Sequence, residues 1–391
     1  MKGTAGIIGL VFWFGCTAPK QPGVDPTLPE AVSAVEAVSP LEILARGTTS
    51  DQPSLRARAL ALLIASSDEP GGGPYVLQAL GDPDPWVQKN AVDVLTQRLN
   101  NDECVERLFQ FLSRTDDYVS AEAQGRAALR LLDAGFAGRL DAYQNRFQEE
   151  QGRPWRTAPW ALLSAKMGHK PALTALTETL SMADVPLEVD FFMELGRSGL
   201  EDLAASMAKG QEFVEEELAL TYAVARLGLG DRGAESVLKG ALDSENESIQ
   251  IDAVELLGRM MGSDKLLMKA AARSGVVGDL GQIALISNGL KSPDALYKYA
   301  THDDRFIREV AARAARTVYT LDTKNAEKVA RQVVKYTIED SDPMVRTEAI
   351  RTAAAIALTS VESELAESLT HDVLSVRIEA AGALNLLRAT K

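Results

Sequence analysis

The side chains best suited to catalysis or metal binding are few in this sequence and lie far apart. Its three histidines are His169, His302 and His371. His302 and His371 each stand directly before an aspartate in a predicted turn, so we expect both to help cap a helix. No histidine lies at His-x-x-x-His spacing or in another tight cluster of the kind that holds zinc. The histidines therefore predict structural roles, and we expect no metal site and no cofactor.

A cysteine and a glycine-rich loop are the remaining candidates for chemistry. Cys104 follows Asp102 and Glu103 near the start of a predicted helix, and these carboxylates disfavour the thiolate that a nucleophile needs. The stretch from Gly71 to Pro74 lacks the Lys-Ser/Thr pair of a phosphate-binding loop. Catalysis requires unlike polar groups that converge on one point. Because no such set is evident, we expect a packing role for Cys104, no enzymatic activity and no small-molecule substrate.

The second cysteine, Cys16, ends a short apolar block. The block from Ala5 to Cys16 has 12 residues, too few to cross a bilayer as a helix but enough for the core of an export signal. Gly15 and Cys16, followed by a polar, proline-rich stretch, resemble the lipobox of bacterial lipoproteins, in which the thiol is acylated. The resemblance implies a signal peptide over residues 1–15, a tether over 16–40 and a membrane anchor on lipidated Cys16. The alternatives are a secretory signal with a chance cysteine, or a buried start of the fold.

The residue after Cys16 bears on where a lipidated chain would reside. Bacterial lipoproteins retained at the inner membrane commonly carry an aspartate there, whereas this chain has Thr17. The resemblance therefore implies an exported body, either on the periplasmic side of the outer membrane or at the cell surface.

The charge of the chain is acidic overall but unevenly distributed. The net charge is −14, which disfavours nucleic acid as a partner. Residues 1–300 hold 28 Lys+Arg against 41 Asp+Glu, and residues 301–391 hold 13 against 14. The segment 305–335 is basic, with eight cationic residues against three acidic ones, 8 − 3 = +5. A basic stripe of this kind could receive an acidic partner, or it could be a solvated face balanced by acidic neighbours.

The elements that position these residues are predicted helices in a repeating pattern. In the stretch from Asp82 to Leu95, Asp84 can cap a helix, Pro85 suits its first position, and Val87 and Ala91 begin an apolar stripe. Similar stretches recur, and the steps between their first apolar residues are 32, 32, 130, 58, 38 and 31 residues. These residues are Leu55, Val87, Val119, Ile249, Ile307, Val345 and Val376. Taking 130 as four units and 58 as two gives a period near 30 to 33, with one longer unit. The period predicts an all-α fold, a superhelical α-solenoid of roughly eleven stacked helical pairs over residues 41–391.

Glycine turns separate many of the predicted pairs. The clearest copy runs Leu227-Gly228-Leu229-Gly230-Asp231-Arg232-Gly233-Ala234. Glycine stops a helix by adopting the left-handed conformation. This turn and the Asp-x-x-Val-Arg-x-x-Ala pattern from Asp342 to Ala349 resemble the HEAT family, in particular the short repeats of bacterial proteins related to phycobilisome lyase subunits. The resemblance covers most of the chain after residue 41 but is poor between about 143 and 215.

The resemblance also implies a role for the recurring charges. In HEAT proteins the Asp of the turn and the Arg of the second helix form ladders between neighbouring units. Here the ladder would join Asp51, Asp84, Asp304 and Asp342 to Arg56, Arg308, Arg346 and Arg377, with Gln88, Ser120 and Gln250 replacing the Arg elsewhere.

Residues that do not recur are the candidates for function. Arg313 and Arg316 should lie on the exposed side of a second helix, the side that lines the concave face in HEAT stacks. Trp155 and Trp160 fall in the poorly matching stretch, where they either fill a break in the stack or line a partner pocket. We therefore expect an exported, lipid-anchored, non-enzymatic scaffold that binds a protein through its concave face. The alternatives are a structural component of the cell envelope and an accessory subunit of an enzyme, as in the lyase-related proteins.

Overall fold

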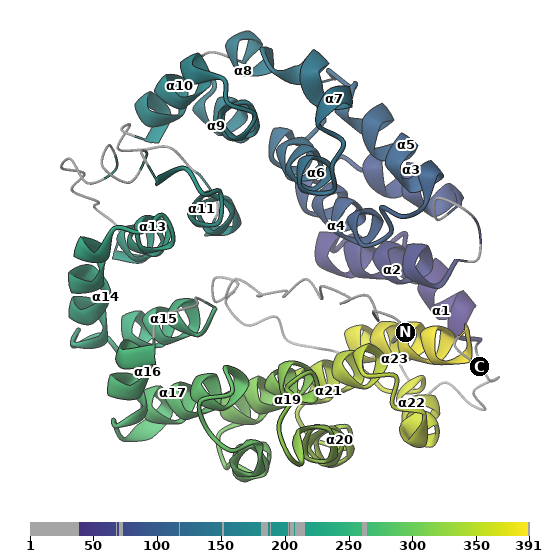
Figure 1. The fold of residues 1–391 in the computed structure, drawn as a ribbon. Helices are drawn as coiled ribbons and strands as arrows, with labels where there is room; N and C mark the ends of the chain where they lie inside the picture. Colours follow the sequence, from purple (N-terminus) through teal and green to yellow (C-terminus); the bar gives the residue numbers. More distant parts are fainter. Residues whose placement is uncertain are drawn as a thin grey trace, which may run out of the picture.

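The fold is a ring of helices. The computed structural model describes residues 39–389 apart from 68, 70–72, 117, 151, 181–186, 188, 202, 204–206, 208–215 and 260–263. The described residues form helices and turns, with no strand among them, and so the predicted all-α class is confirmed. Figure 1 shows the helices following one another around the ring in two layers, one inside the other.

Outer and inner helices alternate along most of the chain. We call an outer helix and the inner helix that follows it a unit. The inner layer consists of α2 (Pro53–Ser66), α4 (Pro85–Thr96), α6 (Ala121–Asp133), α9 (Pro154–Lys166), α11 (Val189–Gly196), α13 (Glu216–Gly228), α15 (Glu247–Gly258), α17 (Gly275–Ser287), α19 (Arg305–Tyr319), α21 (Pro343–Ala355) and α23 (Leu374–Ala389). The outer layer consists of α1 (Pro40–Gly47), α3 (Pro74–Leu80), α5 (Asp102–Leu112), α7 (Ala137–Leu140), α8 (Arg146–Glu149), α10 (Lys170–Leu180), α14 (Glu235–Leu242), α16 (Asp264–Ala271), α18 (Leu296–Ala300), α20 (Ala326–Thr337) and α22 (Glu362–Ser368). Short 3₁₀ turns precede or connect some of them: η2 (Asp141–Tyr143), η3 (Arg232–Ala234), η4 (Pro293–Ala295) and η5 (Thr359–Val361).

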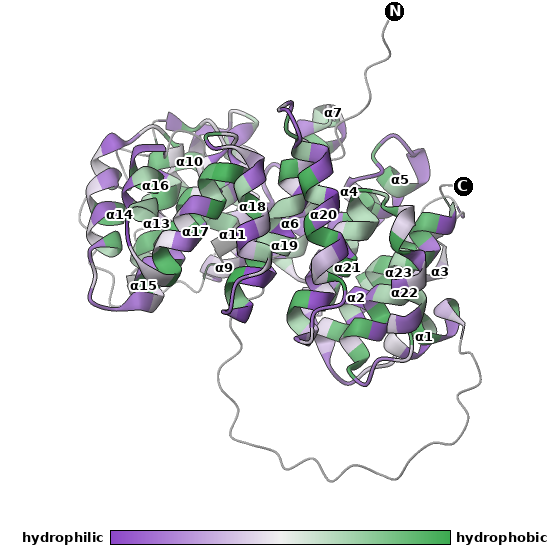
Figure 2. Ribbon diagram, turned by 90° about the horizontal axis from the view of Figure 1, so that it is seen from below, coloured by the Kyte–Doolittle hydropathy of each residue, from purple (hydrophilic) through white to green (hydrophobic). Residues whose placement is uncertain are grey.

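Helix α4 shows how the sequence builds an inner helix. The Asp84 carboxylate accepts a hydrogen bond from the backbone N–H of Trp86 at 2.9 Å, and Pro85 occupies the first turn. Val87, Ala91 and Leu95 are buried at steps of four residues, which places them on one face. Figure 2 shows hydrophobic and hydrophilic residues mixed along most helices, as expected for helices that pack on one side only.

A long donor side chain in the first turn of many inner helices closes the preceding loop. It lies four residues after the N-cap, and it donates to the backbone carbonyl six residues before itself. The pairs are Arg56 to Ser50, Gln88 to Asp82, Gln250 to Ser244, Arg308 to His302, Arg346 to Asp340 and Arg377 to His371. Arginine and glutamine both carry N–H donors, so either can do this, and the alternation of the two types does not interrupt the pattern.

Two of the four arginines of the predicted charge ladder, Arg56 and Arg308, pair with aspartates of the next unit, but not with the predicted ones. Arg346 and Arg377 donate to backbone carbonyls instead. Arg56 makes a bidentate pair with Asp82, at 2.7 and 3.0 Å, and Arg308 pairs in the same way with Asp340, at 2.7 and 3.1 Å. These aspartates lie two residues before the N-cap of the next inner helix. The prediction therefore named the wrong aspartate in each turn, the N-cap itself. The predicted partners Asp84, Asp304 and Asp342 are occupied instead as N-caps of their own helices.

Two further assignments at the turns were wrong. The N-cap position before α2 is held by Gln52, so Asp51 neither caps that helix nor joins the ladder pairs described above. Ser120 is the N-cap of α6. Its hydroxyl accepts from the N–H of Ala123 at 3.1 Å, and its own backbone N–H donates to the Gln88 amide oxygen at 2.9 Å. Val119 was predicted to be the first apolar residue of this helix, but the helix begins after it, at Ala121. Gln124 holds the donor position in this unit and contacts three carbonyls at the end of α5.

Left-handed residues end several helices, as the glycine turns predicted. Gly135, Gly168 and Gly230 have φ of 92°, 87° and 94°, each just after a helix. At Gly168 the turn is closed by a bond from the His169 N–H to the Ser164 carbonyl at 2.9 Å. Ala357, with φ of 51°, ends α21 by the same geometry although it is not glycine.

The first and last units pack directly against each other and close the ring. Helices α1 and α2 contact α23, and Leu44, Leu62 and Ile378 share one buried apolar cluster at this seam. Gly382 permits the close approach, because a Cβ there would lie 2.5 Å from the Leu62 side chain. This closure joins segments more than three hundred residues apart, and a count of repeats along the sequence does not predict it.

The arc that matches the repeat poorly is also irregular in structure. Where it begins, its outer layer is reduced to the short helices α7 and α8 and the turn η2, and a full outer helix returns only with α10. Pro159 lies inside α9 and packs on Gly125 of α6, where a Cβ would come within 2.2 Å of the proline Cβ. Proline removes a backbone donor, and glycine removes the side chain that would collide with it. This part of the ring is held by specific fits that do not recur elsewhere.

Candidate functional site

His302, His371 and Cys104 serve the fold in the way the sequence predicts. The Nδ1 atom of His302 accepts from the backbone N–H of Asp304 at 3.0 Å, and Nδ1 of His371 accepts from that of Val373 at 3.0 Å. Burial lowers the pKa of His371, so the ring is held in the neutral form that can accept this bond. Cys104 is 1% exposed within α5. In the part of the chain that the structure describes, no three His, Cys, Asp or Glu side chains are grouped to hold a metal ion.

The two tryptophans proposed as partner contacts differ in their solvent exposure. Trp160 is fully buried, with Tyr143 stacked on it at 5.9 Å and the Arg146 guanidinium 4.5 Å from its ring centroid. Arg146 in turn donates to the carbonyls of Leu112 and Arg114, which lie in the preceding unit. A partner cannot reach Trp160, so the prediction of a contact there is wrong. Trp155 remains 50% exposed and stays a candidate.

Arg313 and Arg316 lie on the predicted side of α19 but are not exposed. The apolar stripe of α19, which includes Ile307, Ala311 and Val318, is buried. Arg313 and Arg316 fall on the opposite side at 3.6 residues per turn, and this side lines the interior of the ring. Their side chains are only 13% and 11% exposed, because Arg313 is ion-paired with Glu255 of α15, two units before it, and Arg316 with Glu348 of the next inner helix, α21. The prediction gave the right face and the wrong accessibility.

These two arginines belong to a belt of ion pairs that joins inner helices around the ring, called the inner belt here. Its members come from different units and connect side chains at N–O distances of 2.5–3.5 Å. The pairs are Lys89–Glu122, Asp93–Arg126, Arg130–Glu194, Glu255–Arg313, Arg316–Glu348, Arg351–Glu379 and Arg58–Glu379. Most of these pairs join neighbouring inner helices, and two of them, Arg130–Glu194 and Glu255–Arg313, reach past one inner helix to the next. Opposite charges that face each other across units give the inner wall a fixed charge pattern.

Glu379 is the centre of the belt at the seam. Arg58 of α2 donates to both its oxygens at 2.6 and 2.7 Å, and Arg351 of α21 donates at 2.8 Å. Burial opposes ionisation of Glu379, but Arg351 and Arg58 outweigh it and lower its pKa to about 2. The carboxylate therefore stays charged through the neutral range and links the last unit to the first.

At Glu309, on the same wall, the effect of burial on the pKa outweighs that of the neighbouring cations. Glu309 lies one turn before Arg313 on α19, where burial raises its pKa and the Arg313 charge only partly offsets the effect. Its neighbours Glu348 and Glu255 add repulsion. The inner wall therefore contains both strongly ionised and weakly acidic carboxyl groups.

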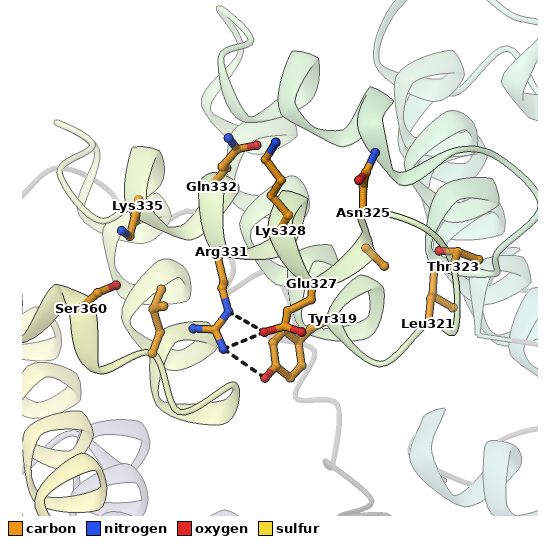
Figure 3. A pocket seen from close by; sticks show the side chains of 12 residues that line it. Tyr319, Leu321, Thr323, Asn325, Glu327, Lys328, Arg331, Gln332, Lys335 and Ser360 are labelled. Atoms are coloured by element: carbon orange, nitrogen blue, oxygen red, sulfur yellow. Dashed lines mark hydrogen bonds and ion pairs between the residues drawn. The ribbon is translucent and has the colours of Figure 1, made fainter.

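A groove on the outer layer is the second candidate surface, and the sequence analysis did not predict it. It has a volume of about 690 Å³ and lies between α20, the turn before it and the start of η5. Figure 3 shows Lys328, Arg331 and Lys335 along α20, with Thr323 and Ser360 at the two ends. The only sequence signal was the basic run 305–335, which did not separate the residues of α19 from those of α20.

The sequence features before residue 39 lie outside the described residues. They include Cys16, the signal peptide over 1–15 and the tether over 16–40 except its last residues. Within the described part of the chain, no helix combines the length and the apolar character needed to cross a membrane.

Comparison with known proteins gives this chain no family. No family model matches it, and no curated protein matches it. Among solved structures it is similar to one described as "Crystal Structure of Engineered Protein. Northeast Structural Genomics Consortium Target OR329". The identity is 17%, the match covers 89% of this chain and 96% of that one, and the TM-score is 0.24.

Proposed function

We propose that this chain is a non-enzymatic scaffold that binds a protein partner on the inner wall of its ring. In this proposal the fold is a HEAT-like α-solenoid whose ends meet, and Cys16 carries a lipid that anchors the exported body to a membrane. The partner contacts the inner helices, whose side chains differ from unit to unit while the frame repeats. Binding is passive, and specificity comes from the charge pattern of the wall.

The closed seam is the observation that carries the proposal. An open stack of helices can bend and twist, whereas a ring fixes the distances between inner helices. The seam combines an apolar cluster around Leu62 and Ile378 with the ion pairs of Glu379. A preformed wall loses little conformational entropy on binding, so a modest contact area gives useful affinity.

The inner belt keeps some of its charge accessible to a partner. Side chains of Arg58, Arg130 and Arg351 are 29%, 34% and 26% exposed even though each is paired. Arg313 and Arg316 are more covered and serve to hold neighbouring helices. The accessible members, rather than Arg313 and Arg316, are therefore the residues to alter in a binding test.

A charge swap tests the inner wall without breaking an ion pair. The variant Arg130→Glu/Glu194→Arg keeps an ion pair between α6 and α11 but inverts its pattern. The matched control Arg232→Glu/Glu235→Arg inverts an exposed pair on the outer layer. Crosslinking and affinity purification from membranes should recover one stoichiometric partner with the wild type and the control, and not with the inner swap. Equal recovery with both swaps would refute the inner-wall contact, and no partner at all would favour a structural role in the envelope.

The anchor requires a separate measurement. Cells fed an alkyne analogue of palmitate should incorporate label into the wild-type protein and not into Cys16→Ser. Mass spectrometry of the mature N-terminus should give acylated cysteine as the first residue. A wild-type protein that carries no lipid would remove the anchor from the proposal and leave the scaffold role to be judged on its own test.

A further inference from the structure

The basic run 305–335 divides into two parts with different roles. All four arginines of α19 are ion-paired: Arg305 with Asp342, Arg308 with Asp340, Arg313 with Glu255 and Arg316 with Glu348. On α20, by contrast, Lys328 and Lys335 are exposed and have no ion-pair partner among the described residues. Of the three lysines in the segment, Lys328 and Lys335 therefore carry unpaired positive charge on the outer groove, while exposed Lys324 lies in the turn before α20 and outside the groove lining.

The groove holds one of its cationic groups in a fixed position. The Nε atom of Arg331 donates to Glu327 at 3.0 Å, and Nη2 donates to the Tyr319 hydroxyl at 3.4 Å. The guanidinium also lies 5.6 Å from the Tyr319 ring centroid. With Lys328 and Lys335, three cations face the groove against the single carboxylate of Glu327, a balance of 3 − 1 = +2. This local excess stands out on a chain of net charge −14.

The arrangement of the cations indicates a ligand with several separated charges. Lys328, Arg331 and Lys335 span seven residues of helix, so their backbone positions cover about 10 Å at 1.5 Å per residue. In Figure 3 their side chains leave α20 in different directions and do not converge on one point. A single small anion would use only one or two of them, whereas about three residues of extended peptide match the span.

The floor and ends of the groove suit a peptide. Leu321 is half-buried in the lining and offers a contact for an apolar side chain, whereas Leu358 is almost fully covered. Gln332 and Ser360 provide hydrogen-bonding groups along the edges. The volume of about 690 Å³ lies within the range of ordinary ligand pockets.

We propose that this groove binds an acidic peptide segment of a protein partner, with carboxylates on Lys328, Arg331 and Lys335 and an apolar side chain on Leu321. The proposal rests on different residues from the inner-wall contact, so either can fail without the other. It gives the ring a second, outward-facing docking surface on α20.

The test is peptide binding to the full chain measured by fluorescence anisotropy. The probe is a fluorescein-labelled hexapeptide of alternating glutamate and leucine, and the reference has glutamine in place of glutamate. The variant Lys328→Glu/Lys335→Glu should bind the acidic peptide at least tenfold more weakly than the wild type. The control Lys239→Glu/Lys265→Glu makes the same change of net charge at exposed lysines of α14 and α16, and it should stay within twofold of the wild type. Circular dichroism should show that both variants are folded.

Four results would overturn the proposal. Equal binding of the glutamate and glutamine peptides would mean that the groove does not recognise acidic charge. Equal weakening by both double variants would show a general effect of net charge. Complete displacement of the peptide by millimolar inorganic phosphate would indicate a site for a single small anion. Groove-dependent binding to vesicles of anionic lipid, without peptide binding, would assign the surface to a membrane.

Discussion

The arc from α19 to α23 and the arc from α6 to α9 solve the same packing problem by different means. In the first, small alanines bring the inner helices together and ion pairs such as Arg316–Glu348 and Arg351–Glu379 connect them. In the second, Trp160 fills the interior and Pro159 fits against Gly125. The first solution can be repeated from unit to unit, whereas the second depends on shapes that occur once.

This difference changes which residues are candidates for function. A feature that does not recur can serve a partner, but it can also fill a place where the repeat fails. Trp160 and Arg146 fill a place where the repeat fails, because both are buried and contact each other. The exposed lysines of α20 do not fill any gap, so they remain available for binding.

We expect the largest loss of stability from a substitution in the irregular arc. Trp160→Ala should reduce the free energy of unfolding by about 4 kcal/mol, since it removes a fully buried aromatic side chain and leaves a cavity. Trp155→Ala, at a half-exposed position in the same helix, should change it by less than about 0.5 kcal/mol. Urea denaturation followed by circular dichroism measures both. Similar losses for the two variants would mean that Trp160 does not hold this arc together.

We expect the next largest loss of stability from a substitution that breaks the ion pairs at the seam. Glu379→Gln should destabilise the protein by about 3 kcal/mol at pH 7, because it leaves Arg58 and Arg351 without their shared carboxylate. Glu327→Gln removes an exposed pair within α20 and should cost less than about 0.5 kcal/mol. Hydrogen exchange should show faster exchange in α1 and α23 for Glu379→Gln only. Unchanged exchange there would show that the apolar contacts close the ring without the charges.

The same variant makes a prediction about pH. The folded-state pKa of Glu379 is about 2, below its value in an unfolded chain, so its stabilisation is present at neutral pH and is lost as the pH falls toward 2. The difference in unfolding midpoint between wild type and Glu379→Gln should therefore shrink between about pH 5 and pH 2. A difference that stays constant over this range would contradict the low pKa.

The sequence predicts local features of this fold far better than distant ones. The caps at Asp84, Asp304 and Asp342 and the turn at Gly230 depend on residues a few positions apart, and all are found. The seam pair Arg58–Glu379 joins residues 321 positions apart, and either residue alone looks like an ordinary surface charge. No local pattern distinguishes it.

The candidate sites show the same limit. Helical periodicity places Arg313 and Arg316 on the inner side of α19, but their partners Glu255 and Glu348 come from other units. Accessibility depends on those partners, so the residues appeared free when only one helix was considered. The outer groove was missed for a related reason, because its lining residues, such as Lys335 of α20 and Ser360 of η5, come from separate elements of the chain.

A smaller effect should separate the two roles of the recurring arginine. Among the described residues Arg346 donates only to the carbonyls of Asp340 and Glu339, so Arg346→Gln should be nearly neutral, as Gln88 holds the same position in another unit. Arg308 also forms the bidentate pair with Asp340, and Arg308→Gln should cost about 1.5 kcal/mol. Thermal unfolding of the two variants measures the difference. Equal losses would mean that the pair with Asp340 adds nothing to the turn.

The smallest expected effect is a gain in stability at the end of α21. Ala357 holds the left-handed conformation that glycine holds at Gly168, and a side chain is strained there. Ala357→Gly should therefore raise the free energy of unfolding by about 0.5 kcal/mol, the relief of strain being partly offset by the greater freedom of glycine in the unfolded chain. The reverse change, Gly168→Ala, meets no atom within 4 Å of the new Cβ, so its expected loss of about 1 kcal/mol reports backbone conformation alone. Opposite signs for the two variants in urea denaturation would establish that the regular and the irregular arcs end their helices by the same rule. A loss of stability in Ala357→Gly would show instead that the methyl group of Ala357 contributes packing that outweighs its strain.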